Sequence, residues 1–471
     1  MIPLPYDIWL HIASFLHEDT IPQIISVNRS LFNIALDHRY RQACIGVCTS
    51  SDGLDRHTKC SPIRDGLSAS RIRHLVIHEG SPYTLPKERV VTVNKRKLSS
   101  WDFLDRIRAR KTRNSSHYDE ESALKVSNEI IDLQELLSSL GSVTTLEIRF
   151  RRYEDAIFYP SKVGFLESGW TTLGVGLTNL IIKSTLDDIA TILRPPTKLI
   201  QLQMFTVQIL PITGPSHNQT ALLKETFLPF LETHRDVLRS LTLECMKEID
   251  MSSLLASLPY MPNLSSFRLA HIFKHPWRVN ISGHKHFLQA QRSLIQHLDL
   301  QLLPQPSVLQ HPGEGFFEDF NRIAFPRLKS LTLQVTRHTC NLPEQAIPYL
   351  QQYLPTLTSL ELRSFTILED DVVRLFSLPM AEYVDPAFDV ISHYYENTNG
   401  VQVYRALPVA LPQWNLYSLN ITPFDFYPER LTFYVRALLA TLPQLQYLCG
   451  VEREELLTSP LRARTNYFPG N

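Results

Sequence analysis

The sequence predicts an α/β protein: a small N-terminal block of three helices, followed by an irregular array of leucine-patterned repeats that each join a strand to a helix. Two features of composition and one pattern support this. About 70 of the 471 residues are leucine, whereas only 16 are glycine, which is roughly half the usual glycine share. A short apolar motif then recurs along most of the chain, at a spacing typical of a solenoid.

The recurring motif reads apolar-x-x-apolar-x-apolar, and each copy is predicted to form a short strand. From Leu180 to Leu360 the central residues of the copies advance by 180 residues in six steps, a mean of 30. Units of this length stack on their neighbours to bury their apolar side chains, which gives a curved array with a parallel strand face. The copies lie at 72–77, 143–148, 177–182, 199–204, 238–243, 264–269, 295–300, 328–333, 357–362 and 416–421.

Helices are predicted between the strands, because apolar residues there recur every three or four positions. The clearest lie at 129–140, 224–234, 252–258 and 431–442. Pro262, Pro326, Pro355 and Pro443 precede strands, where proline ends a helix and favours extended backbone. A Leu-x-x-Leu-x-Leu strand after a helix resembles the leucine-rich-repeat unit. The Asn or Cys that normally follows such a strand is missing, so we expect repeats without an asparagine ladder.

The pattern divides the chain into four parts. Residues 1–45 form the helical block, 46–70 are polar and turn-rich as in a linker, 71–455 form the repeat array, and 456–471 form a tail. Long gaps in the motif predict an insertion around 85–127 and an irregular unit around 380–412. The insertion carries ten basic residues between Lys87 and Arg113 against three acidic ones. This could mark a localisation signal or a nucleic-acid contact, but a solvated loop is the simpler interpretation.

The N-terminal block has the spacing of short helices. Ile8, Ile12 and Phe15 or Leu16 share one face of a first helix, and Asp7 suits the positive end of its dipole. A second helix is expected over 21–27, and Leu31, Ile34 and Ala35 mark a third. A domain this small buries little by itself. We therefore expect it to dock against another polypeptide.

The opening residues resemble an F-box. The similarity covers the first 45 residues or so, and an F-box ahead of a leucine-rich array fits the fungal type of F-box/leucine-rich-repeat protein. Many F-boxes carry Cys-Arg-x-Trp where Asn28-Arg29-Ser30-Leu31 stands here, and leucine offers less contact area than tryptophan. The matching positions are Leu4, Pro5, Asp7, Ile8, Ile12, Phe15, Leu16, Val27, Asn28, Arg29, Leu31, Ile34, Ala35 and Tyr40.

This resemblance implies a substrate-recognition adaptor of an SCF-type ubiquitin ligase. The helical block would bind a Skp-type adaptor, and through it a cullin–RING ligase, while the repeat array would bind a target protein. The chain itself would then not be an enzyme. The alternative is a ligase-independent interaction scaffold that uses the same two modules. By the resemblance, the adaptor contacts are Leu4, Pro5, Ile8, Ile12, Leu16, Val27, Asn28 and Leu31.

Candidate target contacts follow from the geometry of the array. Side chains at the x positions of the strands face outward, and Trp and Arg on repeat loops often form binding hot spots. The outward positions include both charge signs, so neither a strongly acidic nor a strongly basic ligand is indicated. The candidates are Arg268, Asp299, Gln334, Glu361 and Arg363 on strands, and Trp277 and Arg278 in a loop.

Signals for other functions are weak. The phosphate-loop, serine-hydrolase and zinc-protease motifs are absent, and we expect no cofactor. Cys44, Cys48, His57 and Cys60 lack the paired spacing of a zinc site, so we expect free thiols and no metal. Lys and Arg together number 47, as do Asp and Glu; this balance argues against specific nucleic-acid or membrane binding. The sequence has no signal-peptide pattern and no long apolar window, so we expect a reducing cytoplasmic or nuclear setting.

Overall fold

The structure confirms the α/β class, with helices that alternate with mostly parallel strands. The chain divides into two compact units, residues Met1–Gln201 and Leu202–Asn471. The computed structural model describes residues 4–17, 20–24, 26–47, 66–79, 137, 139–150, 164–194, 198–211, 219–245, 249–273, 281–304, 317, 320, 322–334, 340–376, 378, 414–421 and 428–459.

The first unit begins with helices and continues as a parallel sheet. Its strands pair in chain order, so that Leu75 lies opposite Leu146 and Leu146 opposite Leu180. Its elements are α1 (Tyr6–Ser14), η1 (Ile21–Ile24), α2 (Arg29–Tyr40), β1 (Gln42–Val47), α4 (Gly66–Ala69), β2 (His74–Glu79), β3 (Thr145–Arg149), α7 (Gly164–Leu173), β4 (Asn179–Ser184) and α8 (Leu186–Leu193).

The second unit repeats this arrangement over more strands. Its main sheet has the order β5-β6-β7-β8-β9-β11-β13-β14-β15, and only the last pair is antiparallel. The elements are β5 (Met204–Ile209), α9 (Gln219–His234), β6 (Ser240–Cys245), α10 (Met251–Leu255), β7 (Ser266–Phe273), α12 (Ser282–Gln291), β8 (His297–Pro304), β9 (Ser330–Gln334), β10 (Cys340–Asn341), α14 (Ala346–Gln351), β11 (Ser359–Leu362), β12 (Phe365–Thr366), α15 (Glu369–Phe376), β13 (Ser418–Ile421), α18 (Pro428–Thr441), β14 (Tyr447–Leu448), β15 (Val451–Glu452) and α19 (Arg453–Thr458).

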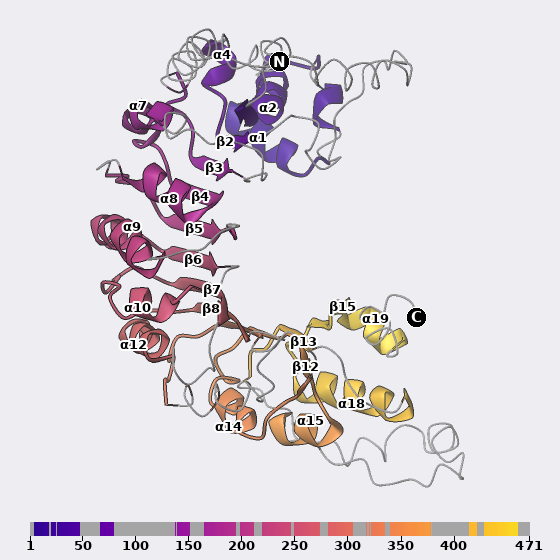
Figure 1. Ribbon diagram of the computed structural model, residues 1–471. Helices are drawn as coiled ribbons and strands as arrows, with labels where there is room; N and C mark the ends of the chain where they lie inside the picture. The colour runs from indigo at the N-terminus through magenta and orange to yellow at the C-terminus, as the bar shows by residue number, and fades with distance from the viewer. Residues whose placement is uncertain are drawn as a thin grey trace, which may run out of the picture. The chain divides into compact units, whose positions relative to one another are not determined.

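Each repeat buries the three apolar residues of its motif. Leu238, Leu241 and Leu243 are almost fully buried around β6, as are Leu331 and Leu333 in β9. Helices α9, α10 and α12 lie along one side of the strands in this unit (Figure 1). Because side chains alternate along a strand, the intervening positions face away from this core, and they form the opposite face of the sheet.

One copy of the motif is shifted from its predicted position. The sequence predicts a strand at 199–204 with Leu202 at its centre, but β5 spans Met204–Ile209 and Phe205 lies opposite Leu241. The strand motif is therefore Leu202-x-x-Phe205-x-Val207. Phe205 fills the central inward position that Phe267 takes in β7 and leucine takes in most of the other repeats, and Leu199 is buried ahead of the strand.

A backbone ladder joins the repeats at the entry to each strand. The carbonyl oxygen of Arg239 accepts hydrogen bonds from the N–H groups of Ser265 and Ser266, and that of Ser265 accepts from those of Gln296 and His297. This arrangement satisfies backbone groups that would otherwise be buried unpaired, without the asparagine side chains of an asparagine ladder. It continues through the carbonyls of Gln296, Lys329, Thr358 and Tyr417.

The predicted helices at 224–234, 252–258 and 431–442 are confirmed as α9, α10 and α18, with ends that differ by a few residues. The helix predicted at 129–140, the insertion around 85–127 and the irregular unit around 380–412 lie almost wholly outside the described residues. Even so, β2 pairs directly with β3, and β11 with β13. Neither long gap therefore inserts a strand between the strands that flank it.

The N-terminal helices differ from the prediction in two ways. The second helix is only the short 3₁₀ turn η1, because Asn28 begins a new helix: its Oδ1 accepts from the Leu31 N–H over 2.8 Å. The third helix, α2, ends at Tyr40. Strand β1 then begins at Gln42 and pairs with β2, so residues 42–45, which we expected to be helical, belong to the first strand of the sheet.

Arg453 connects the elements at the C-terminal end of the second unit by donating hydrogen bonds to backbone carbonyl oxygens. The guanidinium of Arg453 donates to the carbonyl oxygens of Leu439 (3.0 Å) and Leu445 (2.9 Å), and its Nη1 also reaches those of Leu442 and Pro443. The last carbonyls of α18 lack helical partners. Arg453 therefore stabilises the end of the helix and the entry to β14 together.

Replacing Arg453 by methionine keeps the aliphatic stem and removes these hydrogen bonds. We expect the free energy of unfolding of the second unit to fall by about 1.5–3 kcal/mol, as for lost hydrogen bonds to charged groups. Urea denaturation followed by circular dichroism measures the change. Glu454→Gln, at an exposed position of the same helix, is the control. Equal stability of the two variants would contradict the capping role.

Candidate functional site

Helix α1 carries a row of exposed apolar side chains. Leu4 precedes the helix, and Ile8 and Ile12 follow at intervals of four residues, with exposed fractions of 48%, 42% and 39%. Phe15, at the end of the helix, is 77% exposed. At 3.6 residues per turn these four side chains lie on one side of the helix. We call Leu4, Ile8, Ile12 and Phe15 the apolar row.

The apolar row is exposed because the N-terminal helical block has only a small buried interior. Ala13, Leu31 and Ile34 form its buried cluster, and Trp9 and Ile24 pack against that cluster. Ala13 is the only fully buried residue of α1. One side of α1 therefore covers the interior while the apolar row faces outward, and a surface of adjacent large apolar side chains is typical of a binding site.

The block is anchored to the start of the sheet. Arg71, just ahead of β2, forms an ion pair with Asp37 of α2 and donates to the backbone oxygen of Asn33 over 3.2 Å. The Tyr6 hydroxyl of α1 donates to Asp37 over 3.2 Å. These contacts fix α1 and α2 to the first repeat strand of their unit.

The structure separates the predicted adaptor contacts into three groups. Leu4, Pro5, Ile8, Ile12 and Val27 are exposed, and Leu16 is half-buried. Asn28 caps α2, so its side chain supports the helix. Leu31 is only 4% exposed and belongs to the buried cluster, so we remove it from the proposed surface. The resemblance placed Phe15 in the motif but not among the contacts, although it is the most exposed member of the apolar row.

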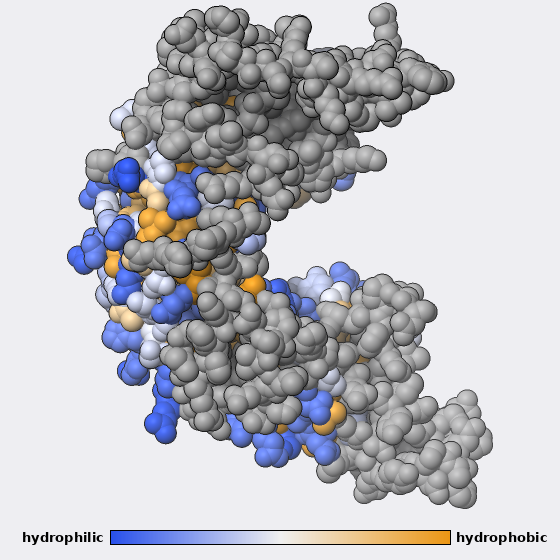
Figure 2. All heavy atoms as spheres, in the orientation of Figure 1, coloured by the Kyte–Doolittle hydropathy of each residue, from blue (hydrophilic) through white to orange (hydrophobic). Residues whose placement is uncertain are grey.

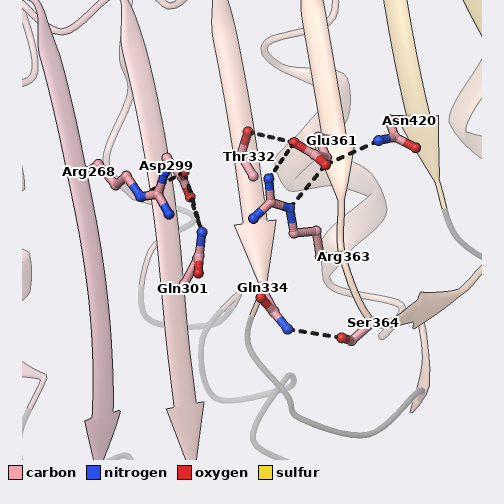
Figure 3. A network of polar contacts seen from close by, with 9 residues as sticks. All are labelled: Arg268, Asp299, Gln301, Thr332, Gln334, Glu361, Arg363, Ser364 and Asn420. Carbon is pink, nitrogen blue, oxygen red and sulfur yellow. Dashed lines mark hydrogen bonds and ion pairs between the residues drawn. The ribbon is translucent and has the colours of Figure 1, made fainter. Parts of the chain in front are cut away.

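A second surface is a polar network on the outward face of the strands in the second unit (Figure 3). Five outward positions are in register across neighbouring strands: Arg268 lies opposite Asp299, Asp299 opposite Thr332, and Thr332 opposite Glu361. Asn420 continues the row on β13. Of the predicted target contacts, Arg268, Asp299, Glu361 and Arg363 are brought together here.

The charged groups of the network pair with one another. Arg363 donates to both carboxylate oxygens of Glu361, over 3.0 and 3.1 Å, and Asn420 donates to the same carboxylate over 3.1 Å. Arg268 lies 3.4 Å from Asp299 and 3.2 Å from Glu244. Such pairing fixes the side chains and leaves little net charge, so this face suits recognition by hydrogen bonding and shape.

Gln301 connects the two halves of the network. In one orientation its amide nitrogen donates to Asp299 over 3.3 Å. In the reversed orientation its oxygen accepts from Arg268 over 3.2 Å and from Arg363 over 2.9 Å. Burial raises the pKa of Asp299 even though the Arg268 guanidinium opposes this. The carboxyl is therefore held in a partly enclosed site between strands.

The remaining predicted strand contact, Gln334, lies opposite Gln301 at the edge of this network (Figure 3). Gln334 donates to the Ser364 hydroxyl over 3.1 Å, in a turn where Ser364 has a φ of 62°. Trp277 and Arg278 lie outside the described residues. So do Cys48, His57 and Cys60, and within the described ranges no group of His, Cys, Asp and Glu side chains could hold a metal ion.

Sequence reasoning missed a buried carboxylate in the first unit. Glu147 of β3 receives hydrogen bonds from Arg149 over 2.7 and 2.8 Å, and Lys183 Nζ lies 3.0 Å away. Burial opposes its ionisation, but the hydrogen bonds from Arg149 and Lys183 hold its pKa below the ordinary value. The available signal was an acidic x position with Arg149 two residues later on the same strand. The contribution of Lys183, which lies on the neighbouring strand β4, becomes visible only once the register is known.

Two histidines, His271 and His284, are also buried. His271 Nε2 lies 2.7 Å from the Ile249 carbonyl oxygen, and its ring stacks on that of His284 at 5.6 Å. Burial lowers the pKa of His271 to about 4. This histidine is therefore neutral near pH 7 and part of the interior between β7 and α12.

Comparison with known proteins does not assign this chain to a family. No protein-family model matches the chain, and no curated protein is significantly similar to it. None of the helices in the described ranges has both the length and the apolar character needed to span a bilayer.

Proposed function

We propose that this chain is an F-box protein with leucine-rich-repeat-like units, and that it acts as a substrate-recognition adaptor of an SCF-type ubiquitin ligase. The observation that carries the proposal is the apolar row on α1. Four large apolar side chains on one side of a short N-terminal helix need a partner surface to cover them. The resemblance of residues 4–40 to an F-box supports a Skp-type adaptor as that partner, which would link the chain to a cullin–RING ligase.

The second module would bind the target. Parallel strands in register present a broad outward face, and its charged groups are held in place by their mutual pairing. A surface of this kind loses little side-chain entropy when a partner binds. Ubiquitin transfer would then depend on positioning: the N-terminal block anchors the chain to the ligase while the repeats hold the target.

Reconstituted ubiquitin transfer tests the proposal against its alternative. The chain, a Skp-type adaptor, a cullin–RING core and a partner trapped from cells are combined with the activating and conjugating enzymes. We expect ubiquitin on the partner only when the chain is present. Adaptor binding without assembly of a cullin complex or ubiquitin transfer would instead favour a ligase-independent scaffold that uses the same two modules.

A further inference from the structure

Basic side chains gather at the edge of the second unit where its strands begin. The segments that lead into β6, β7, β8 and β9 (235–239, 256–265, 292–296 and 322–329) contain six Arg or Lys residues and one acidic residue, Asp236. Asp236 pairs with Arg235 over 3.5 Å. The whole chain has equal numbers of acidic and basic residues, so this edge departs sharply from the average.

Five of these cations are exposed and unpaired within the described part of the chain. All five have exposed side chains, and none forms an ion pair with a described residue: Arg239, Arg292, Arg322, Arg327 and Lys329. We call these five the basic edge. Arg292 is the C-cap of α12, where a cation complements the helix dipole. The other four lie in the segments that lead into β6 and β9, so the helix dipole does not account for their presence.

The backbone ladder fixes their spacing. Arg239 and Lys329 occupy equivalent positions, three steps apart in the series of carbonyls that joins the repeats. Neighbouring strands lie about 4.8 Å apart, so the two positions are separated by roughly 14 Å. Side chains on one side of an extended peptide recur about every 6.8 Å. Three alternate residues of an extended segment would thus span the edge.

We propose that the basic edge binds an acidic, extended segment of a protein partner. Arginine recognises carboxylates through two parallel hydrogen bonds, and Ser265 and Gln296 supply polar groups between the cations. Nucleic acid is less suited, because proteins that bind it tightly neutralise about 6–10 phosphates, and this chain has no net charge to attract a long polyanion. The inference rests on the second unit alone and does not depend on the proposed ligase function.

Fluorescence anisotropy with the whole chain tests the proposal. The probe is a fluorescein-labelled dodecapeptide of alternating Glu and Ser, compared with its Gln-Ser counterpart. We expect the Glu peptide to bind more tightly, and its binding to weaken as salt rises. Arg239→Glu with Lys329→Glu should weaken binding about tenfold or more, as two exposed ion pairs are replaced by repulsion.

The matched control is Lys224→Glu with Arg374→Glu, which changes the net charge equally at helix positions away from this edge. Its affinity should stay within about twofold of the parent chain. If the charge-reversed edge variant does not fold by circular dichroism, Arg239→Gln with Lys329→Gln replaces it, with a smaller loss expected. No binding by the parent chain, an equal loss in the control, or tighter binding of a thymidine oligonucleotide than of the Glu peptide would each overturn the proposal.

Discussion

Changing both Ile8 and Ile12 of α1 to aspartate is expected to abolish binding of a purified Skp-type adaptor. Both side chains are exposed in the structure, so the substitution should leave the fold intact. Burying an isoleucine at an interface contributes about 1.5–3 kcal/mol, and an unpaired carboxylate there would add a desolvation cost. The affinity should fall at least about hundredfold. Co-purification and a titration with labelled adaptor measure it.

Leu10→Asp is the matched control for this variant. Leu10 lies on the same helix and is 51% exposed, but at 100° per residue it points about 160° away from Ile8. The control therefore introduces one aspartate, where the double variant introduces two, on a different side of the same helix. Unchanged binding by the double variant, or an equal loss with Leu10→Asp, would show that the apolar row is not the adaptor surface.

Alanine at Gly283 is expected to destabilise the second unit severely. Glycine to alanine within a helix normally adds about 1 kcal/mol of stability. Here α12 approaches α10 so closely that a Cβ at residue 283 would lie 1.8 Å from the Ser252 carbonyl oxygen. The Gly283 N–H also donates to Ser252 Oγ over 2.9 Å. Because the clash is with backbone, the helices must separate, and we expect a loss of at least about 3 kcal/mol.

Thermal melting and urea denaturation measure this effect. Ser282→Ala, at the exposed neighbouring position in α12, is the control and should melt close to the parent chain. A melting temperature for Gly283→Ala equal to that of the control would mean that α10 and α12 can move apart at little cost. This result would contradict the conclusion that close packing of α12 against α10 excludes a side chain at residue 283.

The strand pattern could be predicted from the sequence because it follows local spacing. Leucines at alternate positions determine which side of each strand is buried, and the proline entries mark where strands begin. The copy at 199–204 was misplaced because Leu199, Leu202 and Met204 also fit the motif. Only pairing with β6 shows that Phe205 occupies the central inward position. Leu202, Phe205 and Val207 fit the same apolar spacing, so spacing alone could not choose between the two positions of this copy.

The sequence could predict which residues belong to each candidate surface, but not which of them are exposed or how they contact one another. The motif at residues 4–40 includes both interior and exposed apolar positions, and spacing alone could not assign Leu31 to the interior and Phe15 to the surface. The contacts within the polar network could not be predicted from spacing alone either. Arg268 and Asp299 can each be recognised from the sequence as outward positions, but their pairing depends on the register between repeats that lie about 30 residues apart in the sequence.

Calorimetric titration of a purified Skp-type adaptor into the chain, repeated at several temperatures, tests the central claim most directly. Covering the apolar row with a partner surface predicts binding with a clearly negative change in heat capacity, the signature of apolar burial. The double aspartate variant should show neither the heat nor the heat-capacity change. If the chain does not bind an adaptor preparation that binds another F-box protein, the claim that the apolar row is an adaptor-binding surface is contradicted.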